Sequence, residues 1–409
     1  MRLLYVSQYY PPEMGAPAAR VSAFARRWAA AGHEVTVLTT FPNHPTGIIP
    51  AGYRGRLRME ERDRGVRIVR TFLYAAANRG IVKRSLCYGS FALSAVLQGY
   101  GPIGRPDVVV ASSPQFLVGL SGLALARLKR APLVLEIRDL WPDSIVAVGA
   151  LPAESAVIRG LQVLERYLYR HADLVVSVTR SFVPHLRAGG AQRVEVVTNG
   201  ADVGMFGAPR DPEADKARFG LSGRFVASFV GTLGMAHGLE TVLDAAERLR
   251  DDRRFLFWLV GEGARRGALE TDARRRGLGN VRFEGQVPRA EIPAVLGASD
   301  AALVLLKPEP LFETVLPSKM FEAMAAGTPV VLGVQGESAD VLRECRAGIA
   351  IPPGDGSALA GALRTIAADP AGAAEFGRCG KRAIVERFSH DRLAAEYLDI
   401  LREVAREAR

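Results

Sequence analysis

Residues 225–249 read FVASFVGTLGMAHGLETVLDAAERL and combine three patterns in one short stretch. The first six residues are apolar or small, which favours a buried strand. Leu239, Val242, Leu243 and Ala246 recur with the spacing of one helix face. A glycine-rich loop stands between these two segments. The stretch therefore predicts a strand, a tight loop and a helix, which is the repeating unit of a parallel α/β sheet.

The same alternation of β-branched runs and helical segments extends over the whole chain of 409 residues. Strands are expected at residues 3–7, 34–39, 66–71, 107–112, 133–137, 173–178 and 194–198, and again at 225–230, 255–260, 281–284, 301–306 and 329–332. Two such series predict an α/β protein of two Rossmann-like domains, with a deep interdomain cleft in which ligands bind.

A polar stretch rich in proline, glycine and charge covers residues 206–223 and is interpreted as a linker. It separates a first domain of residues 1–205 from a second domain of residues 224–389. The last helix, within residues 390–409, carries Leu393, Tyr397 and Leu401 on one face. We expect this helix to pack back on the first domain.

The excess of positive charge lies in the first half of the chain. Residues 1–205 contain 25 Lys and Arg against 14 Asp and Glu, a net charge of +11, whereas residues 206–409 contain 28 against 29. This imbalance indicates an anionic partner: membrane headgroups, a lipid-linked diphosphate or nucleic acid. A solvated, arginine-rich surface explains the same numbers and remains open as an alternative.

Two uncharged stretches, residues 85–104 and 108–126, are candidates for membrane spans. The apolar part of the first covers only residues 86–97, whereas a spanning helix needs ~20 apolar residues. We predict that neither crosses the membrane and that residues 86–97 lie in a membrane interface. The chain starts without a signal-peptide pattern, and its three cysteines are far apart, so a cytoplasmic protein is expected, peripheral on the inner face of the cell membrane.

Two loops are candidates for binding phosphate. Neither the loop of residues 11–17, which contains Gly15, nor the loop that begins at Gly231 has the GxGxxG pattern of dinucleotide-binding enzymes. Each still leads to a helix N-terminus, where backbone N–H groups can face an anion. Ordinary connections between a strand and a helix would have the same composition, so this alternative stays open for both loops.

Residues 313–331, ETVLPSKMFEAMAAGTPVV, give the strongest signal for a binding site. Ser318 is expected to cap a helix, and Lys319 follows in its first turn. A cation is disfavoured at the positive end of the helix dipole unless an anion such as a diphosphate shares that end. Glu322 lies one turn further, where its carboxylate can accept hydrogen bonds from a ribose diol. The alternative is a surface Lys–Glu pair that contributes only ~0.2–0.5 kcal/mol.

Several motifs together extend over essentially the whole chain: PPEMG at 11–15, GHEVTVLT at 32–39, RPDVVVASSP at 105–114, EIRDLWPDS at 136–144, TNGAD at 198–202, VGEG at 260–263, FEGQV at 283–287 and PSKMFEAMAAGTPVV at 317–331. With this set the chain resembles family 4 of the retaining glycosyltransferases, which have the GT-B fold. The resemblance is closest to the branch of bacterial surface-polysaccharide assembly, such as N-acetylfucosaminyl and related amino-sugar transferases.

The resemblance implies roles for several nucleotide-sugar-binding residues. Glu322 corresponds to the second glutamate of the family's E-x7-E motif, which binds the ribose, whereas Thr314 stands at the position of the first and Glu313 is one residue early. Thr232 and His237 replace the arginine and lysine that relatives carry in the phosphate loop.

Lys319, with the backbone N–H groups of residues 315–319, is the candidate for the missing positive charge. Glu262, Gln286 and Val287 are expected near the base. Asp139 matches the position of a catalytic-loop histidine in many relatives, so Asp139 and Lys319 are the candidate catalytic residues.

The function implied by the resemblance is metal-independent transfer of a hexose-type sugar, with retention of configuration. The expected donor is a nucleoside-diphosphate sugar, most simply a UDP-sugar carrying an N-acetylhexosamine or a deoxy derivative. The acceptor would be a glycan or a polyprenyl-diphosphate-linked intermediate of lipopolysaccharide or capsule. Neither a cofactor nor a nucleic acid partner is expected, and the absence of any Asp-x-Asp sequence leaves no ligand set for a bridging metal. Two alternatives remain: a non-hydrolysing UDP-sugar 2-epimerase, and a regulatory protein that binds a nucleotide sugar.

Overall fold

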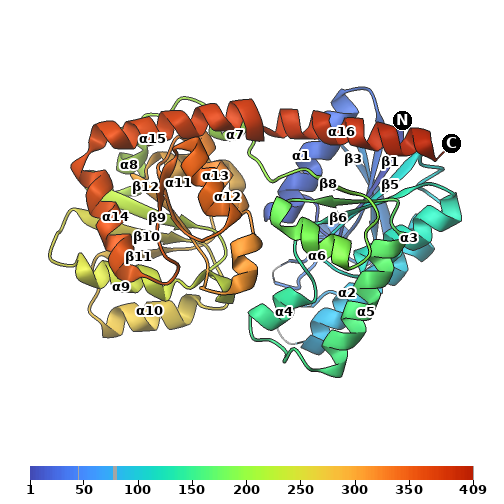
Figure 1. The fold of residues 1–409 in the computed structure, drawn as a ribbon, viewed down its shortest axis with the longest axis horizontal. Helices are drawn as coiled ribbons and strands as arrows, with labels where there is room; N and C mark the ends of the chain where they lie inside the picture. The colour runs from blue at the N-terminus through green and yellow to red at the C-terminus, as the bar shows by residue number, and fades with distance from the viewer. Residues whose placement is uncertain (45, 77–80, 409) are drawn as a thin grey trace. The chain divides into compact units, whose positions relative to one another are not determined.

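The computed structural model describes residues 1–44, 46–76 and 81–408. The chain forms two compact units, Met1–Thr198 together with His390–Arg409, and Asn199–Ser389 (Figure 1). The division falls at Thr198 rather than at residue 205. The stretch of residues 206–223, expected as a linker, belongs to the second unit and contains the helix Pro212–Phe219.

The first unit is built on an eight-stranded sheet in the order β3-β4-β2-β1-β5-β6-β7-β8, in which only the β3–β4 pair is antiparallel. Its strands are β1 (Arg2–Val6), β2 (Glu34–Thr40), β3 (Arg58–Asp63), β4 (Val66–Thr71), β5 (Val108–Ser112), β6 (Leu133–Ile137), β7 (Leu174–Ser177) and β8 (Val194–Val196). Its helices are α1 (Ala16–Ala30), α2 (Ile81–Gly99), α3 (Val118–Lys129), α4 (Asp143–Ala147), α5 (Ala156–His171), α6 (Val183–Ala188) and α16 (His390–Glu407), and the 3₁₀ turns are η1 (Ala51–Tyr53) and η2 (Arg180–Phe182).

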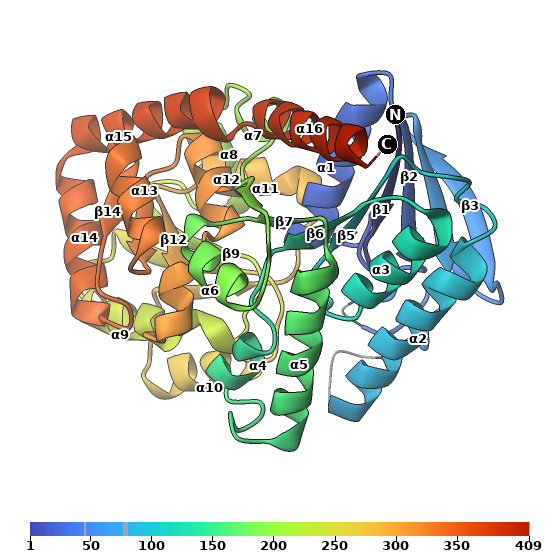
Figure 2. The same cartoon turned by 45° about the vertical axis from the view of Figure 1, so that its right-hand side comes forward.

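Helices α1 and α16 cover one face of this sheet and lie side by side in both views (Figures 1 and 2). Their contact centres on Trp28, whose indole N–H donates to the carbonyl of Ala394 at 2.8 Å. The same ring stacks on Tyr5 of β1 and meets Tyr397 edge-on, each at 5.5 Å between centroids. Residues from the last helix therefore complete the core that begins with the first strand.

Helices α2 and α3 pack together on the other face, against β2, β4, β5 and β6. Helix α2 carries Cys87, Phe91 and Ala95 on its buried side. Its opposite side exposes Leu86, Leu93 and Leu97. No described helix of the chain is long and apolar enough to cross a membrane.

The second unit has a six-stranded, fully parallel sheet in the order β11-β10-β9-β12-β13-β14. Its strands are β9 (Phe225–Val230), β10 (Phe255–Val260), β11 (Val281–Glu284), β12 (Ala301–Leu305), β13 (Val330–Gly333) and β14 (Gly348–Ala350). Its helices are α7 (Val203–Phe206), α8 (Pro212–Phe219), α9 (Glu240–Arg248), α10 (Arg266–Arg275), α11 (Ile292–Gly297), α12 (Ser318–Ala326), α13 (Glu337–Cys345), α14 (Gly356–Ala368) and α15 (Pro370–Ala383). The 3₁₀ turns are η3 (Met235–His237), η4 (Arg289–Glu291) and η5 (Pro310–Thr314), and η6 (Ile384–Phe388) is a π-helix.

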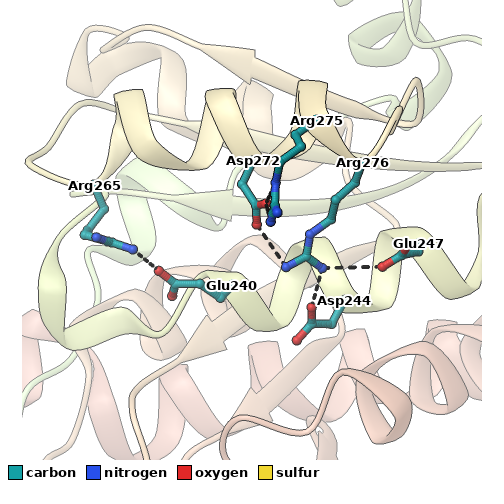
Figure 3. A network of polar contacts seen from close by, with 7 residues as sticks. All are labelled: Glu240, Asp244, Glu247, Arg265, Asp272, Arg275 and Arg276. Atoms are coloured by element: carbon teal, nitrogen blue, oxygen red, sulfur yellow. Dashed lines mark hydrogen bonds and ion pairs between the residues drawn. The ribbon is translucent and has the colours of Figure 1, made fainter.

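Charged side chains join the outer sides of α9 and α10 (Figure 3). The guanidinium of Arg276, one residue beyond α10, pairs with Asp244 at 2.5 Å, with Asp272 at 2.9 Å and with Glu247 at 3.4 Å. The apolar sides of α9 and α10 pack on the core that includes Phe229, Phe257 and Leu303. The ion pairs therefore fix the two helices to each other while their apolar sides hold them on the sheet.

Two strands were missed by the sequence analysis, β3 and β14. Strand β3 reads RMEERD, and none of its residues is fully buried. It pairs only with β4, at the edge of the sheet, where charged side chains are common because they discourage pairing with another chain. Strand β14 is a three-residue edge strand that begins with a glycine. Neither has the apolar run by which a central parallel strand is recognised.

A buried ion pair lies in the middle of the first unit. Arg20 of α1 donates from Nε to Glu136 of β6 at 2.9 Å, and both side chains are almost inaccessible. Arg20 also donates to the carbonyls of Val197 and Thr198 at 2.8 and 2.6 Å. The pair thus joins α1, the central strand β6 and the chain that leaves β8. The pKa of Glu136 is lowered because neighbouring Arg20 and Arg138 outweigh the effect of burial.

Replacing Glu136 by alanine would leave Arg20 buried without its counter-charge. We expect Glu136→Ala to lower the free energy of unfolding by about 3–5 kcal/mol, the usual result of removing one partner of a buried pair. Urea denaturation followed by tryptophan fluorescence measures this. Asp399→Ala is the control in the same unit, because Asp399 is 72% exposed and pairs with Arg402 in the next helical turn; it should cost ~0–1 kcal/mol. Equal costs for the two variants would contradict the prediction.

Candidate active site

Two loops at the carboxyl edge of the second sheet pack together without room for side chains at their glycines. A Cβ added at Gly261, after β10, would lie 2.0 Å from the carbonyl oxygen of Gly231, after β9. A Cβ at Gly263 would lie 2.3 Å from the carbonyl oxygen of Leu233. The backbone N–H of Leu233 donates to the carbonyl of Glu262 at 2.9 Å. The glycines of the GTLG and VGEG sequences therefore fix these loops against each other.

This edge also contains the point at which the order of the strands reverses. From β9 the chain proceeds to β10 on one side, whereas β12 lies on the other side of β9. Loops that leave two such strands diverge, and open α/β sheets bind ligands where they do. The loop after β12 leads to α12, so residues at the start of α12 lie beside the loop after β9.

Lys319 reaches this point from the first turn of α12. Its Nζ lies 4.0 Å from the centre of the Phe229 ring, and a Cβ at Gly231 would be 3.3 Å from the same atom. Nζ is buried and has no hydrogen-bond partner in the described part of the chain. Burial lowers the pKa of Lys319 to about 7, although the nearby Glu322 carboxylate acts in the opposite direction. An unpaired amine in this position is suited to receive an anion.

His237 lies beside Lys319 and is not a second cation. Burial and the charge of Lys319 together lower the pKa of His237 to about 3. The imidazole is therefore neutral, with Nδ1 at 3.3 Å from the carbonyl oxygen of Leu305 and the ring 5.4 Å from that of Phe229. Thr232 is exposed at the surface of the same loop. Of Thr232, His237 and Lys319, only Lys319 can supply positive charge near neutral pH.

The start of α12 differs in one detail from the sequence expectation. Pro317, and not Ser318, is the N-cap residue, and no side chain caps the helix by a hydrogen bond. Ser318 is the first helical residue. Because a proline side chain cannot accept a hydrogen bond, the N-cap residue does not satisfy the N–H groups of the first turn, which is consistent with an external anion at this end.

Glu322 lies one turn beyond Lys319 and is held by an arginine that the sequence analysis did not single out. Its Oε1 accepts from Arg289 Nη2 at 2.9 Å, and the Arg289 guanidinium lies 5.6 Å from the centre of the Phe206 ring. Arg289 therefore fixes the orientation of the carboxylate. Arg289 lies in a short turn between β11 and α11, where no sequence pattern distinguishes it from other surface arginines.

The three residues expected near the base lie after β10 and β11. Glu262 accepts from Arg266 at 2.5 Å, and Arg266 also donates to the carbonyls of Gly261 and Glu284 at 3.2 and 3.1 Å. Gln286 is exposed, and Val287 is half-buried.

Thr314 stands where the family motif has its first glutamate, and its side chain has a hydroxyl instead of a carboxylate. Its hydroxyl donates to the carbonyl of Leu311 at 2.6 Å inside the turn η5. The side chain of Glu313 is exposed. Its backbone carbonyl oxygen lies close to Gly336, since a Cβ added at Gly336 would be 2.1 Å from that oxygen.

In the first unit, Asp139 follows β6 and is partly protonated near neutral pH. Burial raises the pKa of its carboxyl group to about 6, against the hydrogen bond from Ser144, which is 2.5 Å long. The nearby Trp141 indole also lowers this pKa. Asp139 can therefore both accept and donate hydrogen bonds.

The loop that contains Gly15 is held by a buried carboxylate. Gly15 has a φ of 139° and precedes α1. Glu13, buried nearby, accepts from the backbone N–H groups of Asn43 and His44 at 2.8 and 2.9 Å. Burial raises the pKa of Glu13 to about 7. The structure thus gives Glu13 a role in joining two loops, which the sequence pattern did not indicate.

No three His, Cys, Asp or Glu side chains among the described residues come together as a metal site. Cys87, Cys345 and Cys379 are buried and free.

Two family models match the two halves of the chain. The model described as a glycosyl transferase 4-like domain matches residues 15–200, and the one described as glycosyl transferases group 1 matches residues 224–369. Among curated relatives, a candidate colanic acid biosynthesis glycosyl transferase of Escherichia coli, WcaI, is 28% identical over 344 residues, which are 81% of this chain and 83% of the relative.

Solved structures with the same fold include glycosyltransferases. Sucrose-phosphate synthase from Thermosynechococcus elongatus superposes with a TM-score of 0.76 at 20% identity and 98% coverage of both chains. Anabaena HepE, in a complex with UDP-glucose, gives 0.72 at 19% identity, with 98% of this chain and 99% of that one covered. The two Rossmann-like sheets thus form a GT-B fold, as expected.

The low pKa of Lys319 predicts how stability depends on pH. The unfolded chain keeps this amine protonated up to an ordinary pKa near 10.5, whereas the folded chain releases the proton near 7. The unfolded state therefore binds more protons between these values, and the free energy of unfolding rises with pH across this window. At 1.36 kcal/mol per pKa unit the rise is at most about 3 kcal/mol between pH 7 and pH 9.5.

We expect Lys319→Met to lack this rise and to be more stable than the wild type at pH 6–7, because it removes a buried amine without a counter-charge. Thermal unfolding of both proteins at several pH values measures the difference. Lys307→Met, in the loop after β12, is the control for the loss of one lysine. A pH profile of Lys319→Met that parallels the wild type would show that Lys319 does not titrate in this range.

Proposed function

The chain belongs to family 4 of the glycosyltransferases, and on this premise we propose that it transfers an N-acetylated hexosamine or a deoxy derivative from a UDP-sugar. The proposed acceptor is a glycan linked to polyprenyl diphosphate, and the product an intermediate of a surface polysaccharide. The names of two relatives support this setting: WcaI is described as acting in colanic acid biosynthesis, and HepE binds UDP-glucose. Both family models are those of glycosyltransferases, which argues against the 2-epimerase and the regulatory protein.

The unpaired Nζ of Lys319 carries the proposal for the donor site. A diphosphate beside Gly231 would lie at the N-terminus of α12 and next to a buried amine, and its charge would raise the pKa of Lys319 and keep it protonated. This arrangement would replace the arginine and lysine of other family members. Thr232, His237 and Ser318 would contribute neutral hydrogen-bonding groups around the phosphates.

The remaining parts of the donor are assigned to residues at the same edge. Glu322, oriented by Arg289, would accept hydrogen bonds from the two ribose hydroxyls through the oxygen that Arg289 leaves free. Glu262, Gln286 and Val287 would border the base. Thr314 stands in place of the first glutamate of the family motif, so the sugar would meet a hydroxyl or the exposed Glu313 there.

The proposed chemistry needs neither a cofactor nor a metal ion. The bond between the anomeric carbon and the donor phosphate breaks, and the acceptor oxygen bonds to the same carbon from the same face. The acceptor's proton passes to the departing diphosphate, whose charge Lys319 and the helix N-terminus stabilise. Asp139 of the first unit would bind a sugar hydroxyl, which its pKa of about 6 allows it to do as donor or acceptor.

Transfer of labelled sugar from a panel of UDP-, GDP- and dTDP-sugars to a lipid extract tests this proposal. We expect turnover to persist in EDTA. Glu322→Ala should weaken donor binding by roughly 2–4 kcal/mol, since a hydrogen bond to a charged group contributes ~1.5–3 kcal/mol. Glu344→Ala, an exposed carboxylate paired with Arg387 at 3.1 Å, is the control. Donor affinity of Glu322→Ala within threefold of wild type, or activity that only magnesium or manganese restores, would contradict the proposal.

We also propose that the first unit binds the inner face of the cell membrane. The exposed side chains of Leu86, Leu93 and Leu97 form a single stripe along α2, opposite its buried face. Lys83 on the same helix and Arg54 and Arg56 after β2 are exposed and basic. Each cation near an anionic bilayer contributes ~1 kcal/mol, so a few are sufficient for reversible binding.

Liposome co-sedimentation tests the membrane proposal. Binding should require anionic lipid and weaken as salt is raised. Leu93→Glu should reduce it, whereas Val385→Glu, at an equally exposed valine of the second unit, should not. Equal binding to neutral liposomes, or none to anionic ones at low salt, would show that the positive charge of this unit is only solvated.

A further inference from the structure

Polar atoms without partners gather at the carboxyl edge of the first sheet. Within the described residues, buried atoms that lack a hydrogen-bond partner include Oε1 of Gln8, Nε2 of Gln115, and Nε and Nη1 of Arg138. These residues follow β1, β5 and β6, which are consecutive neighbours in the sheet. Buried polar groups are almost always hydrogen-bonded, so a set at one edge requires an explanation.

Hydrogen bonds hold this set in place. The backbone N–H of Arg138 donates to Ser113 Oγ at 2.7 Å, which joins the loop after β6 to the loop after β5. In that second loop, Gln115 accepts from the backbone N–H of Val118 at 2.7 Å through Oε1. That bond fixes the amide, so that its Nε2 donor is the end left without a partner. The strand order also reverses here, between β1 and β5.

Arg138 feels the charges of Glu136 and Asp139, but these carboxylates bond to other groups. Glu136 accepts from Arg20 on one carboxylate oxygen, and from Tyr5 and Ser112 on the other at 2.9 and 2.6 Å. Asp139 accepts from Ser144. No ion pair of Arg138 lies within 4.0 Å among residues that the structure describes. Burial lowers the pKa of Arg138 to about 10, which leaves it charged at neutral pH.

A buried guanidinium without a counter-charge costs free energy, and an external anion would remove that cost. A phosphate group matches the donors present, because its oxygens can accept from a guanidinium and from an amide at the same time. A neutral sugar would leave the charge of Arg138 unbalanced.

We propose that Arg138 and Gln115 bind a phosphate group of the acceptor. This inference rests on the proposed function, in which the acceptor carries a diphosphate and the donor diphosphate lies at Lys319. The donor nucleotide also carries phosphate groups that could bind here. Binding of the acceptor and binding of the nucleotide must therefore be measured separately.

Farnesyl diphosphate, with farnesol as its uncharged counterpart, is the probe for the acceptor, and UDP is the probe for the donor. Arg138→Met should weaken binding of farnesyl diphosphate to the full-length protein at least tenfold while the affinity for UDP stays within threefold. Gln115→Glu, which keeps the oxygen that accepts from Val118 and replaces the unpaired donor by an oxygen, should do the same. Arg159→Met removes an exposed arginine of α5 and should change neither affinity.

Arg138→Met should also unfold at the same temperature as the wild type or a higher one, because it removes an unbalanced buried charge. Equal binding of farnesyl diphosphate to the folded Arg138→Met variant and the wild type would overturn the inference, as would a wild type that binds farnesol equally well. Loss of UDP affinity alone would overturn the assignment to the acceptor. A wild type that binds farnesyl diphosphate through Arg138 but transfers no sugar would contradict the proposed function and not this site.

Discussion

The parallel direction of the strands is the constraint on which the rest of the structure depends. In a parallel sheet the carboxyl ends of all strands lie at one edge, so every loop that follows a strand can contribute to one surface. In the second unit this brings Gly231, Gly261 and Lys319 together from three different parts of the chain. In the first unit it does the same for Gln8, Gln115 and Arg138. The antiparallel pair β3–β4 lies at the far end of its sheet and does not interrupt this edge.

Each carboxyl edge has a cation that the protein does not neutralise, and the two are of different kinds. Lys319 has lost most of its preference for the protonated form, with a pKa of about 7, whereas Arg138 stays charged with a pKa of about 10. A lysine can therefore be a neutral amine in the empty site and take up a proton when its ligand binds. The free-energy cost of burying a charge is then smaller in the empty site. An arginine cannot lose its proton in this way, so its buried charge must be stabilised by neighbouring carboxylates or by a ligand. The carboxylate of Glu136 is already engaged by Arg20.

The fold could be predicted from the sequence because most strands are buried on both faces and therefore appear in the sequence as short apolar runs. Strands β9, β10 and β11 begin and end at the predicted residues, and β3 and β14 were missed because edge strands lack such runs. The residues at the start of α12 could be singled out because Lys319 breaks a local rule on helix dipoles. Arg138, Arg289 and Glu13 break no local rule. The partners of Arg289 and Glu13 lie 30 or more residues away in the chain, and two guanidinium nitrogens of Arg138 have no hydrogen-bond partner among the described residues. Long-range pairing of this kind leaves no periodic trace in one sequence.

The path of the chain has a consequence for biosynthesis. The first unit contains residues that are synthesised before the second unit and residues that are synthesised after it, because α16 supplies Tyr397 and the carbonyl of Ala394 to the ring of Trp28. During translation the second unit can complete its own core while the first still lacks a helix on one face. The nascent first unit then exposes Phe24 and Trp28, which the finished protein buries completely. The order of synthesis is thus the reverse of the order of completion, and a ribosome that stalls within the last helix releases an open sheet that is liable to aggregate.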